Sequence, residues 1–137
     1  MTMTQPMNIF GVAGRAMSAQ LVRLNATASN LANAGGVSGT AEGAYRSMRP
    51  VFKTSYDQAS GLSTVDVQRV MTAGAEPTRR HDPSHPLADA EGFVYENAVD
   101  ETAELVDMME SARHYQNNVE VLQTAKSLIA ETLRLGQ

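Results

Sequence analysis

The 137-residue sequence lacks cysteine and tryptophan, and aromatic residues make up only 5% of it. Without cysteine the chain forms no disulfide, thiolate nucleophile or cysteine-ligated zinc site. No run of about 18 apolar residues occurs, so we expect no membrane-spanning helix. The first residues carry neither a basic nor an apolar segment, and we therefore expect no cleaved secretory signal.

Charge and length set further bounds. The net charge is -4 and the pI is about 5.3, so we expect no nucleic-acid partner. The length fits one domain. The sequence contains 8 methionines, and methionine suits surfaces that pack against several neighbours.

An apolar stripe runs through the last quarter of the chain, residues 100–135. Its members recur every third and fourth residue, and no proline or glycine interrupts the run before Gly136. This pattern predicts an amphipathic helix of about 35 residues, roughly 50 Å long. Acidic residues crowd its start, and Asn97 or Asp100 is the expected cap. The candidate packing residues on this stripe are Leu105, Met108, Tyr115, Val119, Leu122, Ile129 and Leu133.

A second stripe with the same spacing starts at Phe10. It predicts a helix of about 25 residues that ends at Gly35 and Gly36. Several mediocre helix formers, including Asn30, lie near its end. Two interpretations stay open: these side chains make polar contacts with neighbouring elements, or the helix frays toward its C-terminus. The candidate packing residues here are Phe10, Met17, Leu21, Leu24, Asn30, Leu31 and Asn33.

The two predicted helices carry opposite charge. Residues 1–33 contain two arginines and no acidic residue, whereas residues 100–137 contain seven acidic and three basic residues. Opposite charge favours pairing of the two helices with each other over self-pairing. Because the C-terminal stripe is longer, part of it stays uncovered within one chain, which predicts packing between molecules.

The residues between the helices have β character. Residues 62–71 alternate apolar and polar side chains and form the best strand candidate, after a hairpin turn at residues 57–61. Extended segments are also expected around Pro50, at residues 76–86 and at residues 93–95. We therefore predict a mainly α fold, in which long N- and C-terminal helices pair as an α-helical coiled coil around a small β-rich or irregular middle insertion. The predicted segments are 1–34 for the N-terminal helix, 35–98 for the insertion and 99–137 for the C-terminal helix.

One cluster has the composition of a chemical site. His81 and His85, with Asp82 and Ser84 between them, are candidates for a metal site or a nucleophilic triad. A zinc motif with two histidines four residues apart needs both on one helical turn, which the neighbouring prolines prevent. We favour a rigid loop whose Asp and His side chains hydrogen-bond to the backbone. We predict no catalytic residue, no metal site and no cofactor.

Three separated motifs resemble the axial proteins of the bacterial flagellum. Residues 25–33, NATASNLAN, are similar to the N-terminal signature of flagellar rod and hook proteins. Residues 82–95, DPSHPLADAEGFVY, resemble the segment before the C-terminal helix of that family, and residues 115–122 and 132–137 resemble the helix itself. The short middle is similar to that of proximal rod subunits rather than of the longer distal rod or hook proteins.

The resemblance implies a structural subunit of the flagellar proximal rod. Such a subunit assembles through its terminal helices into the drive-shaft tube that transmits torque across the periplasm. The resemblance implies export by the flagellar type III apparatus without a cleaved signal peptide. The implied partners are the other rod subunits, proximal and distal, and the export-gate adaptor and MS ring at the base. No catalysis is implied.

Two other functions stay open. A soluble coiled-coil adaptor or export chaperone would sediment as a sharp dimer without polymerising. A small hydrolase would use His81, Asp82 and His85, and its activity would be lost on His85→Ala.

Overall fold

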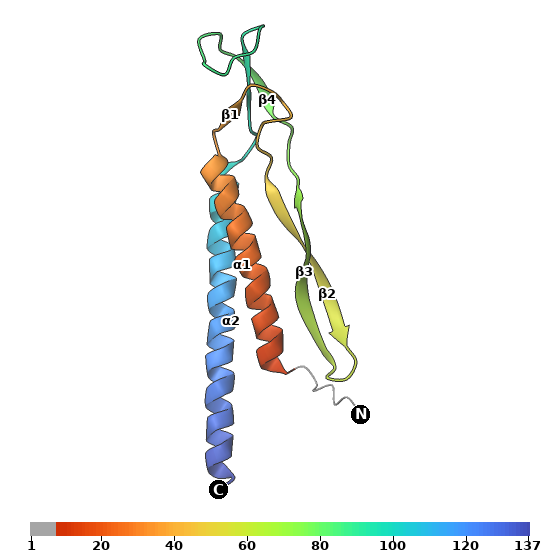
Figure 1. Cartoon of the computed structure of the whole chain (residues 1–137). Helices are drawn as coiled ribbons and strands as arrows, with labels where there is room; N and C mark the ends of the chain where they lie inside the picture. The colour runs from red at the N-terminus through yellow and green to blue at the C-terminus, as the bar shows by residue number, and fades with distance from the viewer. Residues whose placement is uncertain (1–7) are drawn as a thin grey trace.

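The structure, a computed structural model, describes residues 8–137 (Figure 1). The start of the predicted N-terminal segment, residues 1–7, lies outside the described residues. Two long helices run antiparallel, a β-hairpin lies along one of them, and a small sheet closes one end. The elements are α1 (Ile9–Asn33), β1 (Val37–Ser38), β2 (Met48–Asp57), β3 (Leu62–Thr72), β4 (Thr78–His81), β5 (Phe93–Glu96) and α2 (Glu101–Leu135).

Local sequence sets the ends of both helices. Asn8 caps α1 by accepting a hydrogen bond from the Gly11 N–H at 3.1 Å, and Gly35 follows the helix with a left-handed φ of 74°. Asp100 caps α2 by accepting from the Ala103 N–H at 3.1 Å. Asn97, the other expected cap, instead donates its amide to the Gly36 carbonyl at 3.2 Å. The predicted extents of both helices are confirmed.

The two longest strands, β2 and β3, form a twisted hairpin that lies along α1 on the side away from α2 (Figure 1). Asp57 pairs with Leu62, and Gly61 adopts a φ of 68° between them, so the predicted turn is confirmed. The predicted strand at residues 62–71 is confirmed as β3. β2 continues through Pro50, because each strand of a two-stranded ribbon has an unpaired outer edge where proline is tolerated.

The second sheet is antiparallel, with strand order β1-β5-β4, and lies beyond the C-terminal end of α1 (Figure 1). β5 confirms the predicted strand at residues 93–95. The extended chain predicted at residues 76–86 contributes β4, which pairs with β5. The Asn97 N–H donates to the Gly36 carbonyl at 3.2 Å, which joins the segment before α2 to the end of α1.

The prediction of a mainly α coiled coil is wrong. β2 and β3 contain 10 and 11 residues, and with the second sheet they make the fold mixed α and β. We underestimated the β-structure because its apolar content is low. The hairpin lies along α1, and its contacts with that helix include polar ones, such as the ion pair between Arg15 and Asp66 at 3.1 Å, which an apolar pattern does not reveal.

The interior holds little apolar volume. Among residues 8–137, the buried apolar residues are Val94 and four alanines, Ala13, Ala19, Ala26 and Ala125. Buried polar side chains are larger and include Asn30 and Glu104. Small side chains and hydrogen bonds therefore carry much of the contact between the elements. Within residues 8–137, neither helix is long and apolar enough to span a bilayer.

Candidate functional site

Glu104 on α2 lies at the centre of the densest polar contacts between distant parts of the chain. Its carboxylate is 1% exposed, accepts a hydrogen bond from the Asn30 amide of α1 at 3.1 Å, and pairs with the Arg49 guanidinium of β2. Asp107 follows Glu104 on the helix at a spacing of three, so Arg49 reaches it too, at 2.9 Å. A buried carboxylate needs charge and hydrogen bonds to replace water. We call Arg23, Asn30, Arg49, Glu104 and Asp107 the polar node.

Arg23 joins α1 to the node. Its guanidinium donates to Asp107 at 3.0 Å and lies 3.8 Å from Glu110. Arg23 and Arg49 therefore converge on one acidic turn of α2, with charge-assisted hydrogen bonds on both sides. The predicted attraction between the basic N-terminal helix and the acidic C-terminal helix is confirmed at this contact.

Asn30 uses both halves of its side-chain amide. Its Oδ1 accepts from the Met48 N–H at 2.8 Å and from the Tyr45 hydroxyl at 2.7 Å, while its Nδ2 donates to the Met48 carbonyl at 3.0 Å. The Ser29 hydroxyl lies 3.0 Å from that of Tyr45. Ser29 and Asn30, near the end of α1, therefore make the polar contacts with neighbouring segments that the first interpretation expects.

The polar node connects three elements through side-chain contacts. Its charged groups are paired with one another and its one amide is hydrogen-bonded on both sides. Such a network fixes the relative placement of the elements that contribute to it. Here it holds α1, α2 and β2 in one arrangement.

The candidate packing residues of α2 fall into two groups. Four are half-buried, and three, Leu105, Ile129 and Leu133, are exposed to 51, 48 and 66%. Residues that repeat every seven positions shift by about 20° per heptad around a straight helix. The first member of the stripe, Leu105, therefore lies next to the side of α2 that faces α1 and is exposed. Ile129 and Leu133 belong to the last turns of α2, where the helix extends past the start of α1 (Figure 1). The half-buried group is Met108, Tyr115, Val119 and Leu122.

The candidates on α1 are also divided. Met17, Leu24 and Leu31 are half-buried, and Phe10 and Leu21 are exposed on the outer side of the helix. Asn30 is the fully buried member of the polar node. Asn33 donates its amide to the Ser29 carbonyl at 2.8 Å, and its own carbonyl accepts from the Asn97 amide. Asn33 thus connects the end of α1 to the segment before α2.

Sequence reasoning missed a second apolar stripe on α2. Its members recur at helical spacing on a side of α2 that is turned away from most of α1, and Val121 and Leu128 lie beside Ile9 at the start of α1. Polar residues such as Arg113 and Thr124 interrupt the stripe, which hid it beside the more continuous first one. α2 therefore presents apolar side chains in two directions. The exposed members of the second stripe are Val106, Met109, Val121, Leu128 and Leu135.

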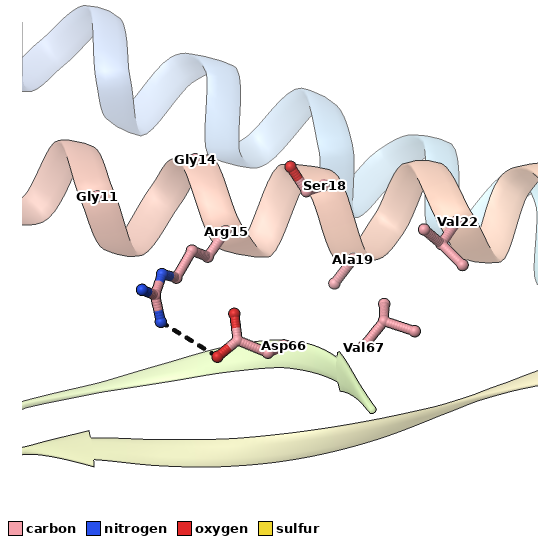
Figure 2. A pocket seen from close by; sticks show the side chains of 8 residues that line it. All are labelled: Gly11, Gly14, Arg15, Ser18, Ala19, Val22, Asp66 and Val67. Carbon is pink, nitrogen blue, oxygen red and sulfur yellow. Dashed lines mark hydrogen bonds and ion pairs between the residues drawn. The ribbon is translucent and has the colours of Figure 1, made fainter. Parts of the chain in front are cut away.

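A groove of about 500 Å³ lies between the first half of α1 and β3. Figure 2 shows Ala19 of α1 close to Val67 of β3 at one end, with the Arg15–Asp66 ion pair at the other. The α1 side of the groove also contains small residues, so the groove is open to solvent there. A Cβ added at Gly14 would meet nothing within 4 Å. These small residues are Gly11, Gly14 and Ser18.

The histidine loop makes the backbone hydrogen bonds that we predicted. His85 Nδ1 accepts from the Leu87 N–H at 3.0 Å, and Asp89 Oδ1 accepts from the Phe93 N–H at 2.9 Å. The Ser84 hydroxyl donates to Asp82 at 2.9 Å and is not directed at a histidine. In the described part of the chain, no group of three or more His, Asp or Glu residues could hold a metal ion.

Comparison with known proteins identifies the family. A family described as "Flagella basal body rod protein" matches residues 10–39, and one described as "Flagellar basal body rod FlgEFG protein C-terminal" matches residues 90–135. The chain is 44% identical to flagellar basal-body rod protein FlgC of Escherichia coli over 131 residues, which cover 96% of this chain and 98% of that protein. It is 45% identical to FlgC of Salmonella typhimurium over 133 residues, with the same coverage, and 32% identical to FlgC of Agrobacterium fabrum over 126 residues, or 90% of each chain. The chain therefore belongs to the FlgC family of flagellar basal-body rod proteins.

Proposed function

We propose that this chain is a structural subunit of the flagellar proximal rod, and that its terminal helices assemble into the tube that transmits torque across the periplasm. The assignment to the rod is supported by relatives that match nearly the whole chain and are named basal-body rod proteins. The role of the helices is supported by the apolar residues that a single chain leaves exposed on them.

The observation that carries the proposal is the uncovered end of α2. Ile9, at the start of α1, lies beside Ala125 and Leu128, and α2 continues past it to Leu135 (Figure 1). Leu133 in this end is 66% exposed. Contiguous apolar surface on a helix is typical of a site that another protein covers. The single chain thus leaves its longest helix open to neighbours.

We assign residues 1–34 and 99–137 to the assembling core and residues 35–98 to an insertion carried by that core. The polar node joins the two parts, because Arg49 of β2 pairs with Glu104 and Asp107 of α2. A force applied to the helices would pass through these ion pairs to the hairpin, and the elements would move together.

We further propose the neighbours of this subunit in the rod. They are the other rod subunits, proximal and distal, and the export-gate adaptor and MS ring at the base. Export by the flagellar type III apparatus, without cleavage of a signal peptide, requires the chain to unfold and refold. The scarcity of buried apolar residues supports this, because little apolar surface is transferred to water on unfolding.

The test is complementation of a motile strain from which the native gene has been deleted. Ile129→Asp and Leu133→Asp, made together, place two charges on the uncovered end of α2. We expect loss of swimming in soft agar and loss of the chain from isolated basal bodies. The matched control is Gln123→Asp with Ser127→Asp, which adds the same charge at exposed polar positions of the same helix and should leave swimming unchanged.

Wild-type swimming by the Ile129→Asp, Leu133→Asp variant would contradict the proposal. Circular dichroism of the purified variant separates an assembly defect from unfolding, since both positions are exposed in the single chain. A wild-type chain that is absent from isolated basal bodies and sediments as a sharp dimer would favour a soluble adaptor or export chaperone.

A further inference from the structure

The groove between α1 and β3 and the last turns of α2 are complementary in size and polarity. The groove holds about 500 Å³ beside small residues, and Gly14 at its mouth has open space where a side chain would be. Leu128 and Leu135 lie seven residues apart on one side of α2 and are 58 and 84% exposed. The groove is therefore lined by small residues, two valines and one ion pair, and the end of α2 presents two exposed leucines.

We propose that the groove of one copy binds the last turns of α2 from a second copy of this chain, with Leu128 and Leu135 in the groove. This inference rests on the proposed assembly function and names one partner of that assembly. The groove runs along α1, with that helix on one side and β3 on the other (Figure 2).

Charge supports this choice of occupant. Arg15 and Asp66 form a half-exposed ion pair at the groove, so each keeps hydrogen-bonding capacity toward solvent. On α2, Glu131 lies between the two leucines on the same side, and Arg134 lies beside Leu135; neither forms an ion pair within residues 8–137. A helix end with one acid and one base thus meets a groove with one base and one acid.

The placement of the two surfaces also fits a repeating contact. Within one chain, α1 lies between β3 and α2 (Figure 1). The end of α2 is displaced from the groove by roughly 20 Å along the helix axis, so parallel copies with an axial offset of this size bring the surfaces together. Each copy offers one groove and one helix end, and such a heterologous contact continues from copy to copy.

The absence of cysteine from the sequence allows a direct test by disulfide cross-linking. The full chain carrying Ser18→Cys in the groove and Leu135→Cys on the helix end is produced in the deletion strain, and isolated basal bodies are oxidised. We expect a ladder of disulfide-linked products at multiples of the chain mass. Co-production of the two single-cysteine chains should give a dimer and no larger product.

Two controls make the result specific. Gln116→Cys with Leu135→Cys places the first thiol at an exposed position of α2 outside the proposed contact, and it should give no ladder. Gly14→Leu, added to the Ser18→Cys, Leu135→Cys chain, fills the mouth of the groove and should reduce the ladder at least tenfold.

Several outcomes would overturn the inference. One is the absence of a ladder from basal bodies that contain the doubly substituted chain, a result that leaves the rod function intact. Others are an equal ladder with Gln116→Cys, a disulfide formed within one chain, or a dominant product that contains a different protein. Absence of even the wild-type chain from basal bodies would overturn the proposed function together with this contact.

Discussion

Asn30 of α1 and Glu104 of α2 are joined by a hydrogen bond of 3.1 Å, although they lie 74 residues apart, and both side chains are almost completely buried. Glu104 also pairs with Arg49 of β2, so one carboxylate connects three elements. Removing one member of such a group leaves the buried members with fewer hydrogen bonds than they can make, which costs free energy.

We expect Glu104→Ala to lower the free energy of unfolding by about 2 kcal/mol, because the Asn30 amide and the Arg49 guanidinium each lose one of their two acceptors. Glu104→Gln keeps a carbonyl oxygen for Asn30 and loses only the charge, so it should cost about half as much. Urea titration of the purified chain, followed by circular dichroism, measures both. A Glu104→Ala variant as stable as wild type would show that the node contributes nothing.

Charge reversal at Arg23 should weaken the pairing of the two helices. Arg23→Glu replaces a cation that contacts Asp107 and Glu110 with an anion, and we expect a loss of about 1–2 kcal/mol together with reduced swimming. Arg69→Glu is the matched control, since Arg69 is exposed and forms no ion pair in the described part of the chain. Motility equal to that of wild type in the Arg23→Glu strain would refute this prediction.

Substitutions at half-buried and at exposed leucines should distinguish effects on folding from effects on assembly. Leu24→Asn and Leu122→Asn each place an amide at a half-buried position between the elements, and we expect each to cost about 2–3 kcal/mol and to block rod growth. Leu133→Asn, at a 66% exposed position, should change the free energy of unfolding by less than about 0.5 kcal/mol and still impair swimming. Urea titration and soft-agar motility give the two readouts. A stability loss at Leu133 equal to that at Leu122 would contradict the idea of an uncovered helix end.

Substitution by alanine should change the stability of the chain in opposite directions at two glycines. Gly14→Ala removes a flexible residue from the interior of α1 where a Cβ meets nothing within 4 Å, so it should stabilise the chain by about 0.5–1 kcal/mol. Gly92→Ala should destabilise it by about 1–3 kcal/mol, because Gly92 has a φ of 80° and a Cβ there would approach Pro83 Cγ to 3.0 Å. Thermal denaturation of the two variants in parallel measures the difference, and destabilisation by Gly14→Ala would imply packing at that site that the single chain does not show.

Features that depend on neighbouring residues could be predicted from the sequence. The cap at Asp100, the helix end at Gly35 and the turn at Gly61 each follow from the chemistry of a few adjacent residues. The alternation at residues 62–71 likewise predicted β3. The extent of the β-structure was missed because the hairpin is held against α1 partly by polar side chains, which apolar periodicity does not detect.

The polar node could not be predicted in the same way. The sequence shows polar residues near Asn30 and acidic residues near Glu104, but their contact depends on how far α1 and α2 overlap. The apolar stripes had a related ambiguity. They identified residues such as Leu105 and Ile129 as candidates for packing. A heptad stripe shifts slowly around a straight helix, so the spacing alone did not say which of these residues one chain would bury.

The small apolar interior has a thermodynamic consequence. The heat-capacity change of unfolding and its sensitivity to urea both increase with the surface newly exposed to solvent, and Val94 with four alanines contributes little apolar area. An isolated subunit should therefore show a broad melting curve and a stability that varies only gently with temperature. A steep, cooperative unfolding transition would then be expected of the assembled subunits, because assembly buries the exposed leucines along α2.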